Sequence, residues 1–305
     1  MDGANTSLRA QQRAEQLASR FPALLVAADR VATTVAQGVH GRRRVGQGES
    51  FWQFRRYEPG DQTTMIDWRQ SAKSRHVFVR ENEWEAAQSV WLWRDISPSM
   101  DYSSSRQLES KRNRADLLLL ALAALLMRGG ERFALLGAGG APATGRAAFN
   151  RLTASVLDDL VLTEDPTRPD TREDSLPPAD PLPRYGHVVL IGDFLVPLPE
   201  VQAVVMALAG RGVRGMMMQV LDPAEENLPF RGRVRFSGFE GENDTLMSRV
   251  EAIRQGYHTR LADHWAGLET IAKQVGWGFT VHATDKSPES ALLMLYTALA
   301  PEMGA

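Results

Sequence analysis

Apolar and polar positions follow two different patterns along this chain. From Ser89 onward, each short apolar run, of the kind found in buried strands, is followed by a longer segment with helical spacing. The expected strands are "SVWLW", "RFALLGA", "HVVLIGD", "RGMMMQVLD" and "GFTVHAT". Among the helical segments, the one before the last strand is expected to run from Asp244 to Gly276 as one or two helices. Strands that alternate with helices predict an α/β fold, a doubly wound and mostly parallel sheet with helices on both faces.

The part before Ser89 has a different pattern. Apolar residues at helical spacing predict a helix over about Ser7 to Gln37. After a glycine-rich break, aromatic and β-branched pieces between Phe51 and Glu85 predict a few strands joined by the turn "EPGD". We therefore expect two parts. Residues 1–87 form an N-terminal helix and a small β extension, and residues 88–305 form the α/β domain.

The most apolar segment, "LLLLALAALLM", lies inside one of the predicted helices. It is too short to span a bilayer, which takes about 20 apolar residues. The N-terminus is polar and mixed in charge, unlike a signal peptide. We expect a central buried helix and no membrane span.

Composition narrows the function classes. The 305 residues are 43% hydrophobic and 24% charged, which is ordinary for a globular protein. A formal net charge of −2 disfavours a general polyanion binder. The chain has no cysteine, so disulfides, thiolate metal sites and cysteine nucleophiles are excluded, and a cytoplasmic location is expected.

Candidate chemistry gathers where two of the predicted strands end. Asp95, Ser97 and Ser99 follow "SVWLW" at alternate positions, and Asp193 ends "HVVLIGD". Open α/β sheets bind ligands beyond the carboxyl ends of their strands, so neighbouring strands would bring these side chains together. Carboxylate and hydroxyl oxygens suit Mg²⁺ or Mn²⁺. The alternative is a capped turn and a strand-end aspartate that accepts backbone N–H bonds.

Several sequence blocks resemble known families. "WRDISPSM" is similar to the Asp-x-Ser-x-Ser element of von Willebrand factor A domains, which opens their metal-ion-dependent adhesion site. Other blocks, in order along Gly41 to Leu299, resemble the domain-of-unknown-function 58 family. These blocks are "RRYEPGDQTTMIDWRQSAKS", "FVRENEWE", "LIGDFLVPLP", "VLDPAEENLPFRGRVRF" and "VHATDKSPESALLMLY".

The resemblance implies a von Willebrand A-like, Rossmann-type fold preceded by a family-specific extension. It also implies an association with MoxR-type AAA+ ATPases, as an adaptor rather than an enzyme. By position, Asp95, Ser97 and Ser99 match the first element of the adhesion site, and Asp193 matches its final aspartate. Thr144 is the nearest candidate for the middle threonine. Thr64 stands where the family commonly has an arginine.

The segment before the α/β domain offers a candidate partner surface. Its densest family-like block contains Arg56, Tyr57, Asp61, Asp67 and Trp68. The structural alternative for this block is a tight turn with a tryptophan that anchors the extension.

Basic residues between Arg42 and Arg80 alternate with aromatics, as in surfaces that bind single-stranded nucleic acid. Acidic residues lie in the same segment, so ion pairs are the commoner outcome and nucleic-acid binding is not favoured.

We therefore predict a non-catalytic, metal-dependent binding module. A Mg²⁺ or Mn²⁺ ion at Asp95, Ser97, Ser99 and Asp193 would accept an acidic side chain of a partner, for which the resemblance suggests a MoxR-type ATPase. One rival is a metal-assisted phosphohydrolase with Asp95 as nucleophile, although Ser97 replaces the second aspartate that such enzymes commonly carry. The other rival is nucleic-acid binding through the Arg42 to Arg80 region.

Overall fold

The computed structural model describes most of the chain in two units. The described residues are 22–37, 51–57, 66–73, 76–82, 89–163, 175–178, 182–184, 186–238 and 244–299. Arg42–Gln88 form the smaller unit, and Met1–Gly41 with Ser89–Ala305 form the larger one. The sequence led us to group the N-terminal helix with the small β extension. In the structure, the helix over residues 22–37 instead packs into the core of the larger unit.

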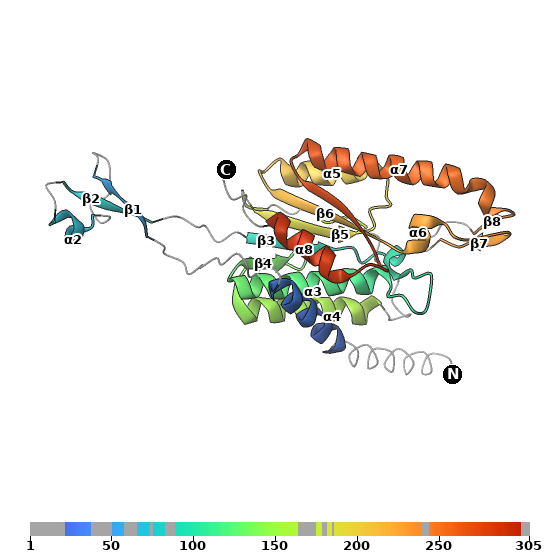
Figure 1. Cartoon of the computed structure of the whole chain (residues 1–305), viewed down its shortest axis with the longest axis horizontal. Helices are drawn as coiled ribbons and strands as arrows, with labels where there is room; N and C mark the ends of the chain where they lie inside the picture. Colours follow the sequence, from blue (N-terminus) through green and yellow to red (C-terminus); the bar gives the residue numbers. More distant parts are fainter. Residues whose placement is uncertain are drawn as a thin grey trace. The chain divides into compact units, whose positions relative to one another are not determined.

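The larger unit is built on one five-stranded sheet in which every neighbouring pair of strands is parallel (Figure 1). From edge to edge the strands are β4 (Arg132–Leu135), β3 (Ser89–Arg94), β5 (His187–Gly192), β6 (Arg214–Leu221) and β9 (Gly278–Ala283). The five predicted strands and the α/β fold are confirmed. The strand order reverses between β3 and β5, so the carboxyl ends of these two strands flank the crevice where such sheets bind ligands.

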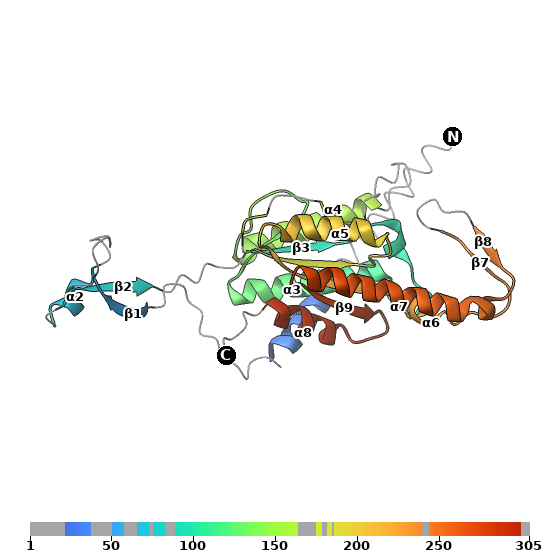
Figure 2. The same cartoon turned by 90° about the horizontal axis from the view of Figure 1, so that it is seen from above.

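Helices cover both faces of the sheet (Figures 1 and 2). Side chains of β3 alternate, with Val90 and Leu92 packed in one core cluster and Trp91 and Trp93 in the other. The cluster of Val90 includes the helix over residues 22–37, α3 (Lys111–Gly129), α4 (Gly145–Thr163) and α8 (Pro288–Leu299). The cluster of Trp91 includes α5 (Leu198–Ala209) and α7 (Val250–Gln274). Right-handed crossovers place helices on opposite faces when the strand order reverses.

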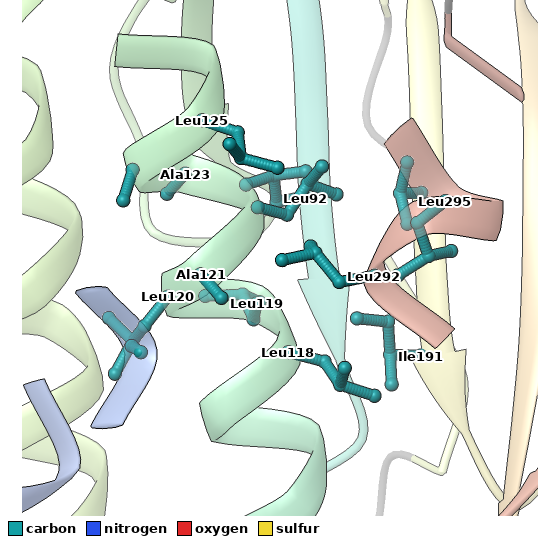
Figure 3. Packing of buried hydrophobic residues seen from close by; sticks show 14 of the residues in the cluster. Leu92, Leu118, Leu119, Leu120, Ala121, Ala123, Leu125, Ile191, Leu292 and Leu295 are labelled. Carbon is teal, nitrogen blue, oxygen red and sulfur yellow. The ribbon is translucent and has the colours of Figure 1, made fainter. Parts of the chain in front are cut away.

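Helix α3 is the centre of the larger core, and this confirms the predicted buried helix. Its side chains from Leu117 to Leu126 are all buried. Figure 3 shows Leu92 of β3 beside the leucines of α3, and the N-terminal helix next to Leu120. The Ser110 hydroxyl caps α3 by accepting a hydrogen bond from the Asn113 N–H, and Gly130 ends it in the left-handed conformation at φ 76°.

The smaller unit holds an antiparallel pair, β1 (Phe51–Arg56) and β2 (Phe78–Asn82), with the short α2 (Trp68–Ser71). The Ser71 hydroxyl accepts from the Phe78 N–H at 2.8 Å and donates to the Asp67 carbonyl at 2.7 Å, which ties α2 to β2. The sequence predicted strands in this segment. The expected turn "EPGD" lies outside the described residues.

One predicted helix starts later than expected. The pattern from Asp244 predicted a helix, but β8 (Thr245–Met247) pairs antiparallel with β7 (Val234–Phe236), and α7 begins only at Val250. Before this pair, Asp222 and Glu225 form a capping box that starts the short α6 (Pro223–Asn227). This segment lies beside the ends of the central strands.

Gly215 provides a test of the packing on β6. The nearest ring atoms of Trp277 would lie 2.2–2.5 Å from a Cβ at this position. We expect Gly215→Ala to lower the free energy of unfolding by about 1–3 kcal/mol, measured by urea denaturation. Gly256→Ala is the control: its Cβ would meet nothing within 4 Å on α7, so a gain of about 0.5–1 kcal/mol is expected. Equal stability of Gly215→Ala and wild type would contradict the packing.

Candidate metal centre

The site forms because β3 and β5 are neighbours. Trp93 pairs with Leu190 and Arg94 with Ile191, and the Asp95 N–H donates to the Ile191 carbonyl at 2.8 Å. Asp95 and Asp193 therefore leave the sheet at the same edge, one on each side of the reversal in strand order. The carboxylates that the sequence placed at two strand ends are brought together.

The loop after β3 brings its hydroxyls to the same point. Asp95 Oδ1 accepts the Ser97 N–H at 2.8 Å, which curls the chain into the 3₁₀ turn η2 (Pro98–Asp101). Ser97 Oγ lies 3.0 Å from Ser99 Oγ, and Ser99 Oγ donates to Asp193 Oδ2 at 2.7 Å. Asp95 and Ser97 are 0% exposed and Asp193 is 1% exposed. The structure thus gathers four of the five predicted ligands into one cluster, in which Ser99 is half-buried and the other three are buried.

One oxygen of the Asp95 carboxylate is the candidate position for a cation. Within the described part of the chain, no donor reaches its Oδ2, although the atom is buried. Gly192 leaves room beside it, because a Cβ at residue 192 would come within 3.3 Å of this oxygen. Burial, followed by the nearby charge of Asp193, raises the pKa of Asp95 to about 7. A buried, unpartnered carboxylate oxygen among hydroxyls fits a hard cation such as Mg²⁺ or Mn²⁺.

Lys111, the first residue of α3, reaches into the cluster from the side. Its Nζ donates to Asp193 Oδ2 at 2.9 Å and to Glu225 Oε1 at 2.7 Å, and the residue is 0% exposed. Burial alone would lower the pKa of the ammonium, but the charges of Asp193 and Glu225 outweigh it and raise the pKa above its ordinary value. A cation of the protein itself therefore already neutralises part of the site.

Arg112 positions the loop that carries the serines. Its Nη2 donates to the Ile96 carbonyl at 2.6 Å and to the Ser97 carbonyl at 3.1 Å, and its Nε pairs with Asp101. Sequence analysis missed Lys111, Arg112 and Glu225. One signal was present: two basic residues in the first turn of a helix oppose its macrodipole, which favours acidic side chains there.

The structure does not bring Thr144 to this cluster. Ala143, its neighbour, bridges Phe133 on β4, and Phe133 pairs with Val90 near the start of β3. Asp95 lies five residues after Val90, just past the end of β3, which is roughly 16 Å away at about 3.3 Å per residue. In the described part of the chain, no three His, Asp or Glu side chains gather as a metal site. The candidate therefore rests on two carboxylates and two hydroxyls.

A cavity of about 480 Å³ opens beside the cluster. Ser99, Asp193 and Glu225 line its polar side. Its apolar walls come from the loop after β5 and from the segment that follows α6, and they include Leu195, Val196, Pro197, Leu228, Phe230 and Phe236. A ligand in this cavity would touch both the predicted metal ligands and an apolar surface.

The predicted partner-binding residues lie in the smaller unit. The Tyr57 N–H donates to the Val77 carbonyl, and the Asp67 N–H donates to the Phe78 carbonyl, each at 2.9 Å. Trp68 is 67% exposed. Asp61 lies outside the described residues, as do Arg42, Arg43, Arg44 and Arg75 of the basic segment. Neither the partner surface nor nucleic-acid binding is tested by this geometry, and both stay predictions.

Comparison with known proteins identifies relatives. Residues 53–267 match the family described as "Protein of unknown function DUF58", so the predicted resemblance to that family is confirmed. "Uncharacterized protein Rv1480" of Mycobacterium tuberculosis and "Uncharacterized protein Mb1516" of Mycobacterium bovis are each 28% identical over 268 residues. These matches cover 83% of this chain and 80% of the relative.

Similar solved structures include BatB from Bacteroides thetaiotaomicron, with a TM-score of 0.38 and 16% identity over 70% of this chain and 98% of that one. Another is an aerotolerance-related membrane protein from Bacteroides fragilis, with a TM-score of 0.35 and 15% identity over 69% and 98% of the two chains. A third is an uncharacterized membrane spanning protein from Vibrio fischeri, with a TM-score of 0.18 and 14% identity over 69% and 98%.

Two predictions about location disagree with these names. The sequence led us to expect a cytoplasmic protein without a membrane span, whereas two of the similar structures are named as membrane proteins. Neither expectation is retained. Among the described helices, none combines the length and the apolar character that crossing a bilayer requires.

Proposed function

Because this chain belongs to the DUF58 family, whose function is unknown, we propose its function from its own site: a metal-dependent protein-binding module, acting as an adaptor and not as an enzyme. The observation that carries the proposal is the buried Oδ2 of Asp95, which no donor reaches among the described residues. It lies in a cluster with Ser97, Ser99 and Asp193, all of which carry oxygen atoms that hard cations prefer.

Each of these residues has a role in the proposal. Asp95 and Asp193 supply the negative charge that offsets a divalent cation, and Ser97 and Ser99 supply neutral oxygens. Arg112 holds the carbonyls of Ile96 and Ser97, so the serines are oriented before a ligand arrives. A bound Mg²⁺ or Mn²⁺ would supply Lewis acidity towards a carboxylate of the partner.

The cavity beside the cluster supports a protein as the partner. Ser99 and Asp193 belong to both the cluster and the cavity lining, and the remaining wall is largely apolar. A partner segment with an acidic side chain next to an apolar one would use both surfaces. The family resemblance suggests a MoxR-type AAA+ ATPase, and we propose that class of partner on this ground.

Titration of the chelator-treated protein with Mg²⁺ and Mn²⁺ in a calorimeter tests the metal. Wild type is expected to show saturable binding, and Asp95→Asn to bind at least 100-fold more weakly, because the variant loses a charged oxygen ligand in a buried site. Asp158→Asn on the exposed face of α4 is the matched control and should bind as wild type does. Binding that is equal in wild type and Asp95→Asn would place the metal elsewhere.

Two further assays separate adaptor from enzyme. Co-purification with a MoxR-type ATPase should depend on Asp95 and on the divalent ion; capture that survives both Asp95→Asn and chelation would refute the metal bridge. Release of phosphate from a generic phosphate ester, lost in Asp95→Asn, would replace the adaptor by the phosphohydrolase in which Asp95 is the nucleophile.

A further inference from the structure

Lys111 is the most fully buried cation of the site, and the proposed function does not use it. Its side chain passes from the first turn of α3 between two carboxylates, Asp193 at 2.9 Å and Glu225 at 2.7 Å. The residue is 0% exposed, and its backbone N–H is bound to the Tyr102 carbonyl at 3.2 Å. Such burial removes a lysine from water completely, and it occurs where the ammonium is paired.

The pairing uses the same oxygen that the metal site needs. Asp193 Oδ2 accepts both the Lys111 ammonium and the Ser99 hydroxyl, while Asp193 Oδ1 accepts the Leu195 N–H at 3.2 Å. Both oxygens of Asp193 are therefore engaged by groups of the protein. A divalent cation that binds Asp193 competes with the ammonium of Lys111 for that carboxylate. A cation that binds only Asp95 and the serines is repelled by the same ammonium, which lies against the neighbouring Asp193.

We infer that Lys111 is a resident counter-cation of the metal centre, which competes with divalent ions for Asp193 and keeps their affinity low. This inference rests on the proposed function, because it assumes that the Asp95 cluster can hold a metal. Glu225 is a second acceptor for the ammonium. When Asp193 binds a metal, Lys111 keeps its hydrogen bond to Glu225 Oε1. Metal binding then exchanges one cation for another and leaves no buried charge unpaired.

Lys111→Met tests the inference, since methionine keeps an unbranched apolar side chain and removes the charge. In calorimetric titrations with Mg²⁺ and with Mn²⁺, the variant is expected to bind at least tenfold more tightly than wild type, which corresponds to about 1.4 kcal/mol. Lys111→Arg retains a cation and should retain weak binding. Lys273→Met on α7, where the lysine side chain is 70% exposed, removes the same charge far from the site and should leave the affinity unchanged.

Thermal unfolding provides an independent readout and guards against misfolding. Without divalent ions, Lys111→Met leaves two carboxylates without their counter-cation, so its unfolding midpoint should fall by roughly 5–15 °C. Mg²⁺ should restore most of that loss in the variant and raise the wild-type midpoint much less. If Lys111→Met alone does not fold, the double variant Lys111→Met with Glu225→Gln removes one of the two unpaired carboxylates. The same calorimetric titration is then made on the double variant.

The outcomes separate this inference from the proposed function. Tighter binding in Lys111→Met that disappears when Asp95→Asn is added supports both. Equal affinity in wild type and folded Lys111→Met overturns the inference but leaves the metal site standing. Binding in the variant without measurable binding in wild type supports Lys111 as the counter-cation and overturns a metal-dependent function of the native protein. Absence of binding in both proteins overturns both ideas.

Discussion

Replacement of Asp116 by alanine is expected to lower the free energy of unfolding by about 3–5 kcal/mol, because it leaves a buried arginine without its main partner. Arg94 ends β3 and is 4% exposed, and Asp116 on α3 is 0% exposed. Arg94 Nε donates to Asp116 Oδ1, and Arg94 Nη1 lies 3.2 Å from Asp159 Oδ2. Among the described residues, removal of Asp116 leaves the guanidinium with the more exposed carboxylate of Asp159.

Urea denaturation near neutral pH measures this effect, and two further variants isolate it. Asp159→Ala removes a carboxylate that is 31% exposed, so a cost of about 1 kcal/mol or less is expected. The double replacement Arg94→Met with Asp116→Leu removes both charges and should recover most of the stability lost in Asp116→Ala. If Asp116→Ala costs no more than Asp159→Ala, the buried pair does not contribute as its geometry indicates.

Lowering the pH from 7 to 4 is expected to reduce the free energy of unfolding of the wild-type protein by roughly 3 kcal/mol more than that of a His282→Gln variant. His282 on β9 is 4% exposed, and its Nε2 lies 2.9 Å from Arg114 Nη1. A guanidinium only donates, so the imidazole accepts and is neutral. Burial, followed by the charge of Arg114, lowers the pKa of His282 to about 4, while the weaker influence of Asp285 opposes this.

The direction of this pH dependence follows from the number of protons bound by the folded and the unfolded protein. Between about pH 6.5 and pH 4 the unfolded chain binds a proton at residue 282 and the folded protein does not, so the contribution of His282 is present above pH 6.5 and is lost as the pH falls. Urea denaturation at a series of pH values measures it. Wild type and His282→Gln share every other titrating group, so the difference between them isolates this residue. If the free energy of unfolding depends on pH in the same way in both proteins, the pKa of His282 does not differ between the folded and unfolded states.

The fold was predictable where local burial decides structure. An apolar run reflects the burial of its own segment, so the five strands and the helix around Leu117 to Leu126 follow from residues close in sequence. The helix predicted from Asp244 failed over its first residues because Thr245–Met247 finds a strand partner in Val234–Phe236. The spacing of apolar residues within one segment does not show that this segment pairs with another.

The candidate site was predictable only for the residues that share a loop or end a predicted strand. Asp95, Ser97 and Ser99 share one short loop, and Asp193 ends a strand of its own, so a parallel sheet suffices to suggest their meeting. Lys111 and Asp193 are 82 positions apart, and Lys111 and Glu225 are 114 apart. No spacing rule joins them. Thr144 shows the reverse error, since it was the nearest candidate by order along the chain but lies near the other end of β3.

The sequence by itself determined the class of fold, the central helix and the two carboxylates at strand ends, because periodicity and strand-end position are properties of neighbouring residues. Only the tertiary structure decided that β3 and β5 are adjacent, which carboxylates share a crevice and which cation lies among them. The physical reason is that a buried charge is stable only beside a partner. That partner is chosen by packing between segments far apart in the chain.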